Sequence, residues 1–235
     1  MLWYKGWLET RWKLLMALAM AALFVVVDSF AGAKGPPPPA ARAVAGFVQM
    51  GASFVVVVYS WLAGAGIVTQ PSFQATKGIH GSTLFTLSLP VSRFHLLAVR
   101  AGLGWLEMAG AIGLYCWGMW LTLPAAVGLV TAMEMFEYAA ALIACASSFY
   151  FLSALLATFL DDLWRVWGGM IAYGALWLLS SYVRVPASLN IVRAMIGEAS
   201  PLRAHKMPWT PMAFSLGLSV ILFCGALKIV RAREY

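Results

Sequence analysis

The chain is organised into long apolar runs, and short segments between them carry most of its charged residues and prolines. Six of these runs are long enough to cross a bilayer, which takes about 20 apolar residues as a helix. In chain order they are Leu14–Phe30, Ala43–Val68, Leu96–Leu123, Ala139–Leu160, Val166–Tyr182 and Met212–Val230. The pattern predicts an all-α polytopic membrane protein, in which residues 1–235 form a single transmembrane domain.

The bounds of the fourth run follow from its length. No proline interrupts residues 125–160, and a helix over all of them would be longer than a hydrocarbon core of about 30 Å. Asp161 and Asp162 mark one water boundary, and counting back about 22 residues places the other near Ala139. We therefore expect residues 125–138 to project outside the membrane or to lie along its outer surface.

Two segments flank the first run. Residues 1–13 have aromatic residues at helical spacing, which predicts an amphipathic helix in the membrane interface. A basic start, an apolar stretch and Ala31-Gly32-Ala33 also resemble a signal peptide with its cleavage site, and that alternative stays open. The prolines from Pro36 to Pro39 predict a stiff external loop before the second run.

The charges are few, and their positions predict the topology. Only 11% of the residues are charged and 62% are hydrophobic, which excludes most soluble enzymes and nucleic-acid binders. Ten of the 16 Lys and Arg residues fall on one side if six runs cross and both termini lie on that side. Because cytoplasmic segments carry an excess of Lys and Arg, we expect both termini to be cytoplasmic.

Several motifs of known catalytic and nucleotide-binding sites are missing from the sequence. It has no phosphate-binding G-x-x-x-x-G-K-[ST] loop, no H-E-x-x-H and no G-x-S-x-G. The cysteines, Cys116, Cys145 and Cys224, form no C-x-x-C pair and are expected to be packing residues. His80, His95 and His205 are far apart, so we interpret them as solvated polar residues. We expect no catalytic site, metal or cofactor in this chain.

Carboxylates inside or near the apolar runs are costly and often functional, and Glu107, Glu134 and Glu137 are candidates of this kind. Glu107 follows Arg100 by two helical turns, which places it about 10 Å deeper in the third run. We expect it inside the core, either in a hydrogen-bonded structural role or on a transport path. Glu134 and Glu137 are expected at the wet outer boundary.

The stretch from Thr76 to Arg100 is the most informative, and it lies in the polar-leaning cytoplasmic segment of residues 70–95. Ser82 can cap a short helix to Leu89, whose apolar side would hold Leu84, Phe85 and Leu87. Pro90 ends that helix, and Ser92 can cap the next one, which runs through Arg93 into the third run. Taken alone, the stretch fits a lipid-anchoring helix as well as a partner-binding one.

This stretch resembles one in a known family. Gly81 to Leu84, the sequence LSLPVSR over residues 87–93, Leu96-Leu97 and Arg100 are similar to the segment between the second and third spans of type-2 ATP-binding-cassette (ABC-2) permeases. The layout is also similar, with an N-terminal interfacial helix, six spans and a long external segment over residues 183–210. The acidic Asp161-Asp162 departs from the basic residues expected at that loop.

The resemblance implies a permease, of exporter type, in a bacterial inner membrane. Its partners would be separate ATPase subunits, which bind ATP and Mg²⁺, and a second permease chain, identical or different. The coupling residues that it implies are Ser82, Leu84, Phe85, Leu87, Pro90, Ser92 and Arg93. The substrate is not implied. The alternatives left open are a channel or secondary carrier that does not use ATP, and a membrane-embedded enzyme.

Overall fold

The computed structural model describes residues 2–32, 40–63, 92–122, 130–158, 160, 162–182, 186 and 189–232, and these residues form helices without any strand. The helices are α1 (Leu2–Gly32), α2 (Ala40–Leu62), α5 (Arg93–Thr122), α7 (Ala132–Leu156), α8 (Asp162–Tyr182), α9 (Ile191–Ile196), α10 (Pro201–Ala204) and α11 (Trp209–Ala232). The predicted all-α class is therefore confirmed for this part of the chain.

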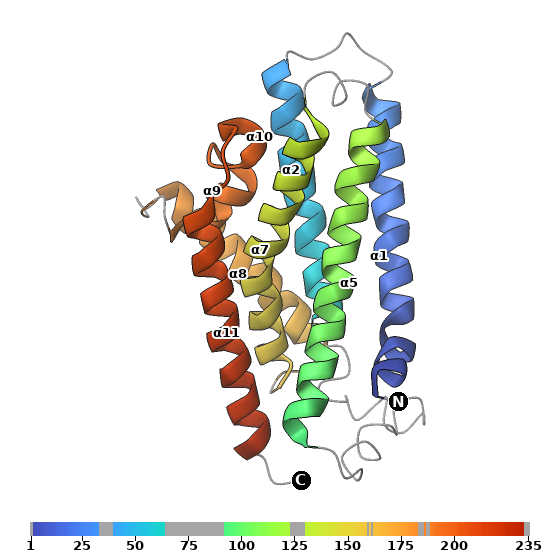
Figure 1. Ribbon diagram of the computed structural model, residues 1–235, viewed down its shortest axis with the longest axis vertical. Coiled ribbons are helices and arrows are strands. Elements are labelled where there is room, and N and C mark those ends of the chain that lie inside the picture. Colours follow the sequence, from blue (N-terminus) through green and yellow to red (C-terminus); the bar gives the residue numbers. More distant parts are fainter. Residues whose placement is uncertain are drawn as a thin grey trace.

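The long helices form an elongated bundle in which successive helices run in opposite directions (Figure 1). The start of α1, the end of α2, the start of α5 and the end of α11 all lie at one end of it. The short helices α9 and α10 lie toward the opposite end (Figure 1). The end where α1 starts and α11 ends is called the terminal end, and the end toward α9 and α10 is called the distal end.

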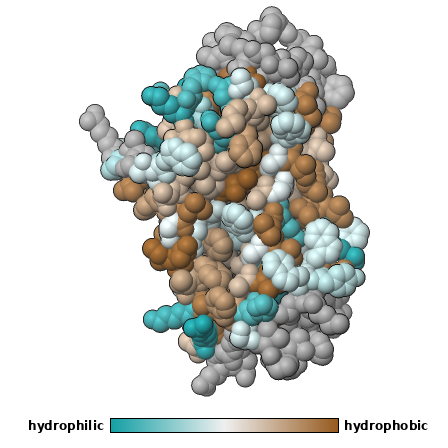
Figure 2. Space-filling model, in the orientation of Figure 1, coloured by the Kyte–Doolittle hydropathy of each residue, from teal (hydrophilic) through white to brown (hydrophobic). Residues whose placement is uncertain are grey.

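Among the described residues, three helices are long and apolar enough to cross a membrane, over Phe94–Leu121, Ala132–Leu156 and Trp209–Ala232. Shorter apolar stretches occupy Val48–Leu62 in α2 and Val166–Ser180 in α8. Figure 2 shows hydrophilic residues at the distal end and again near the end of α11, with a mostly hydrophobic surface between them. This distribution indicates a membrane protein, because lipid solvates the apolar flank and water the two ends.

Helix α7 is the centre of the bundle. It packs against α2, α5, α8, α9, α10 and α11. Many of the buried residues of α7 are small, namely Ala141, Ala144, Cys145, Ala146, Ser147, Ser148, Ser153 and Ala154. Small side chains let helix backbones approach closely, which is the main source of helix association in lipid.

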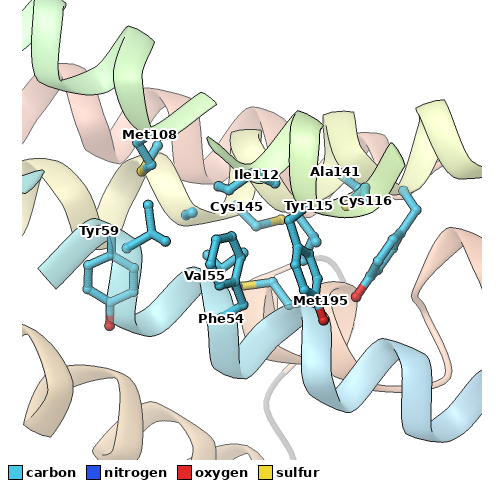
Figure 3. Close-up of a cluster of buried hydrophobic side chains, with 14 of the residues drawn as sticks. Phe54, Val55, Tyr59, Met108, Ile112, Tyr115, Cys116, Ala141, Cys145 and Met195 are labelled. Carbon is cyan, nitrogen blue, oxygen red and sulfur yellow. The ribbon is translucent and has the colours of Figure 1, made fainter. Parts of the chain in front are cut away.

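The core between α2, α5, α7 and α9 is drawn in Figure 3. Phe54 and Val55 of α2 face Ile112 of α5 and Cys145 of α7, and Met195 of α9 closes one side (Figure 3). Phe54 stacks on Tyr115 of α5 with 4.3 Å between the ring centres. The buried cysteines Cys116 and Cys145 are packing residues in this core, as predicted, whereas Cys224 of α11 is exposed.

Buried tyrosines tie neighbouring helices together through their hydroxyl groups. Tyr138 of α7 donates to the Val48 carbonyl of α2 at 3.0 Å, and Tyr150 of α7 donates to the Ala101 carbonyl of α5 at 2.9 Å. Tyr59 of α2 donates to the Gly169 carbonyl of α8 at 3.0 Å. A helix carbonyl has a second lone pair beside its own helical bond, so each tie satisfies a buried hydroxyl without breaking the helix.

Glycines make room for these ties. Gly51 and Gly104 each follow the accepting residue by three positions, so they lie on the same helix face one turn later. A Cβ on Gly51 would lie 2.5 Å from the Tyr138 hydroxyl oxygen, and a Cβ on Gly104 would be just as close to that of Tyr150. Any larger side chain at either position would therefore push the tyrosine away from its acceptor.

Two sequence predictions on helix bounds differ from the structure. Residues 2–13 are not a separate interfacial helix but the start of the continuous helix α1, because no proline separates them from the apolar run. Helix α7 begins at Ala132 rather than Ala139 and ends at Leu156 rather than Leu160. Its start is fixed by Thr131 and Glu134, which cap each other's backbone N–H groups.

The other bounds follow the apolar runs. Helices α5, α8 and α11 contain almost the whole third, fifth and sixth runs, and α8 ends at Tyr182 as predicted. The predicted proline-rich loop and the last part of the second run lie outside the described residues.

Candidate functional site

Of the predicted coupling residues, only Ser92 and the backbone of Arg93 belong to the described part of the chain. Ser82, Leu84, Phe85, Leu87 and Pro90 lie outside the described residues, as does the side chain of Arg93. Their role stays a prediction.

The capping role of Ser92 is confirmed. The backbone N–H of His95 donates to Ser92 Oγ at 3.2 Å, and α5 begins at Arg93. Leu96 and Leu97, which follow in the sequence pattern, are both buried in the bundle. Helix α2 ends and α5 begins at the terminal end of the bundle (Figure 1).

Buried charged residues follow along α5. Arg100 is 9% exposed and Glu107 is 7% exposed, although both carry a charge in water. The two positions are seven residues apart, which places them on the same face of the helix about 10 Å from each other. The structure thus puts Glu107 in the bundle interior, as the sequence predicts.

Glu107 is held by a residue that the sequence analysis missed. The Thr10 hydroxyl of α1 donates to Glu107 Oε1, and Thr10 is itself only 4% exposed. Glu107 Oε2 is also buried and has no hydrogen-bond partner among the described residues. A carboxyl group in this position is costly, so it is either kept for the contact with α1 or used on a transport path.

The contact between Thr10 and Glu107 also fixes α1 against α5. The two helices pack against each other along much of the length of α1. Both helices start at the terminal end and run in the same direction (Figure 1). No sequence pattern pairs two residues that are 97 positions apart, which is why Thr10 could not be found from the sequence.

A second polar contact lies at the start of α7. Glu134 Oε2 accepts from the Thr131 N–H at 2.8 Å, while the Thr131 hydroxyl accepts from the Glu134 N–H at 3.2 Å. The other carboxyl oxygen of Glu134 lies 2.7 Å from His205 Nδ1. A carboxylate in the first turn is favoured by the helix dipole, so Glu134 is explained by its structural contacts.

His205 is exposed, as predicted, but it also has this partner. Its side chain is 69% exposed, and its backbone is left-handed with φ 49° where α10 ends. The contact therefore holds the segment after α10 against the start of α7. The third carboxylate, Glu137, is half-buried one turn further along.

The described residues contain no group of three or more His, Cys, Asp or Glu side chains that could hold a metal ion. Two of the polar contacts among these residues involve carboxylates, namely the α1–α5 contact at Glu107 and the α7–α10 contact at Glu134. Both contacts join neighbouring helices.

Comparison with known proteins identifies no relative. No protein family, no curated protein and no solved structure matches this chain. The function is therefore argued from the chain's own residues.

Proposed function

We propose that this chain is the membrane-spanning permease subunit of a type-2 ATP-binding-cassette exporter, and that a separate ATPase subunit drives it. The observation that carries the proposal is the end of the α2–α5 connection. There Ser92, within the sequence LSLPVSR, caps α5, and the leucines and arginine that complete the pattern are buried in the bundle.

The arrangement of the long helices supports six membrane crossings. Three described helices have the length and apolar composition for crossing, α2 and α8 add shorter apolar stretches beside them, and α1 is the sixth long helix. The first helix, α1, begins at the terminal end of the bundle, and the last helix, α11, ends there, which fits an even number of crossings (Figure 1). The excess of Lys and Arg on that side supports a cytoplasmic terminal end.

Helix α5 can carry a mechanical signal from the coupling segment. It has 30 residues, or about 45 Å at 1.5 Å per residue, and it packs against α1, α2, α7 and α11. A tilt imposed at Arg93 would therefore move side chains along the whole bundle, Glu107 included. Packed helices switch between discrete arrangements, which is what alternating access by a transporter needs.

The coupling residues have separate tasks in this proposal. Leu84, Phe85 and Leu87 form the apolar contact with the ATPase, and Pro90 sets the angle between the coupling helix and α5. Arg93 pairs with an acidic group on the ATPase. ATP and Mg²⁺ bind to the ATPase, and a second permease chain completes the transport path.

Charge reversal tests the coupling directly. The chain is reconstituted with its ATPase, and Arg93→Glu and the pair Leu84→Asp with Leu87→Asp are compared with Lys228→Glu, an exposed basic residue near the end of α11. We expect all variants to insert and dimerise. Only the changes at residues 84, 87 and 93 should release the ATPase or separate hydrolysis from transport. Full coupling in those variants would show that the segment is only a membrane anchor.

A further inference from the structure

A cavity of about 340 Å³ opens among α2, α8, α9 and α10, toward the distal end of the bundle. Small-molecule sites in proteins commonly have volumes of about 300–1,000 Å³. The polar residues that line it are Gln49 of α2, Ser180 of α8, Arg193 of α9 and Arg203 of α10. Helices far apart in the sequence thus contribute to one concave site.

The cavity is positively charged. Arg193 and Arg203 both line it, and no acidic side chain of the described part of the chain does. Neither arginine makes an ion pair with a described residue. Two guanidinium groups at one cavity repel each other, and an anion bound between them would remove that repulsion.

Arg193 is held by hydrogen bonds, and the helix that carries Arg203 is held in place. Arg193 Nη2 donates to the Ser180 carbonyl at 3.3 Å, and its backbone N–H donates to Asn190 Oδ1 at 2.9 Å. Arg203 is on α10, whose end is held against α7 by the contact between His205 and Glu134. A site that is already ordered loses less entropy when a ligand binds.

The remaining lining is apolar on one side. Trp177 and Ile196 line the cavity, and Trp177 lies among exposed leucines of α8, namely Leu176, Leu178 and Leu179. These residues lie on a helix with an apolar stretch over Val166–Ser180, next to which lipid chains would lie. Tryptophan is common at the boundary between lipid and water, which is where this cavity would open.

We propose that this cavity binds the phosphate group of an anionic amphiphile, with Arg193 and Arg203 contacting the phosphate and the apolar chain lying along α8 beside Trp177. Arginine suits phosphate because its planar fork of N–H donors matches two phosphate oxygens at once. Gln49 can add a neutral donor to the same group. The inference does not depend on the coupling proposed above, since it concerns the distal end of the bundle.

The test measures binding to the full-length chain purified in a neutral detergent. The ligands are inorganic phosphate, short-chain phosphatidic acid, and short-chain phosphatidylcholine as a zwitterionic lipid of the same length. The variants are Arg193→Gln, Arg203→Gln and the control Lys206→Gln. Lys206 is exposed in the same segment but does not line the cavity, so its variant loses the same charge without changing the site.

We expect phosphatidic acid to bind at least tenfold more tightly than inorganic phosphate or phosphatidylcholine. Each arginine variant should weaken phosphatidic acid binding about tenfold, while Lys206→Gln should change it less than twofold. Arg203 donates no side-chain hydrogen bond within the described structure, so its variant tests the site without loss of a structural contact.

Other results would overturn the proposal. Equal binding of phosphatidylcholine would show a site that does not select an anionic lipid, and tighter binding of inorganic phosphate would show a site for a free anion instead of an amphiphile. Equal losses in all three variants would show a general effect of charge, and no loss in any would place the ligand elsewhere.

Discussion

The contact between Gly104 and Tyr150 gives a sharp test of the packing around α7. A Cβ on Gly104 would lie closer than 3.0 Å to the Tyr150 hydroxyl oxygen and 3.3 Å from the Leu62 carbonyl oxygen of α2. Three helices therefore meet at a position where the structure has no space for a methyl group. Gly102, two residues away on the same helix, would place a Cβ in open space.

The two alanine variants should differ in sign. Gly102→Ala should stabilise the fold by up to about 1 kcal/mol, because alanine favours the helix over glycine. Gly104→Ala gains the same helix preference but adds about 1–3 kcal/mol of overpacking and weakens a hydrogen bond worth about 1 kcal/mol. We expect a net loss of about 1–3 kcal/mol for Gly104→Ala.

A double-mutant cycle identifies the atom responsible. Tyr150→Phe alone should cost about 0.5–1.5 kcal/mol, since it removes one interhelical hydrogen bond. With the hydroxyl gone, the nearest ring atom to the new methyl is Cζ at 3.5 Å, an ordinary contact. The double variant should therefore be at least about 1 kcal/mol more stable than the sum of the single variants predicts.

The assay is equilibrium unfolding of the purified chain in mixed detergent micelles, with helix content followed by circular dichroism. Equal midpoints for Gly102→Ala and Gly104→Ala would refute the close approach of Tyr150 to α5. Strict additivity in the cycle would show that the hydroxyl group is not the obstructing atom, and that Leu62 of α2 is.

Other predictions concern Glu107, the start of α7 and the topology. Glu107→Gln should impair transport or assembly more than Glu137→Gln, because only Glu107 is buried against α1, and equal, silent behaviour of both would remove any special role for it. Thr131→Ala should lower the free energy of unfolding by about 1 kcal/mol through loss of the capping box, and an unchanged unfolding midpoint would contradict that role. Cysteines that replace Trp3 and Tyr235 should both react only from the cytoplasmic side, whereas labelling from opposite sides would exclude an even number of crossings.

The sequence predicts most helices well because apolar length is a strong local signal in a membrane protein. Helices α5, α8 and α11 follow their apolar runs, and Ser92 could be identified as a cap from its position alone. The start of α7 was missed, although Thr131 and Glu134 form a readable capping box. The count of apolar residues back from Asp161 gave less information than this local hydrogen-bond pattern.

The polar contacts between helices could not be predicted. The burial of Glu107 followed from its depth, but Thr10 depends on how α1 is rotated against α5. The same holds for the tyrosine ties and for the cavity lined by Gln49, Arg193 and Arg203. Such contacts depend on helix register, and no local pattern in the chain sets the register of two distant helices.

The most direct test of the central claim is ATP hydrolysis by the chain isolated from its native membrane. The chain carries an affinity tag and is purified in mild detergent, once under conditions that keep its partners and once after they are stripped away. We predict that the first preparation contains a P-loop ATPase subunit and hydrolyses ATP, and that the stripped chain does not. Transport by a preparation that contains no ATPase subunit, or hydrolysis by the chain alone, would contradict the assignment as the permease of an ATP-driven transporter.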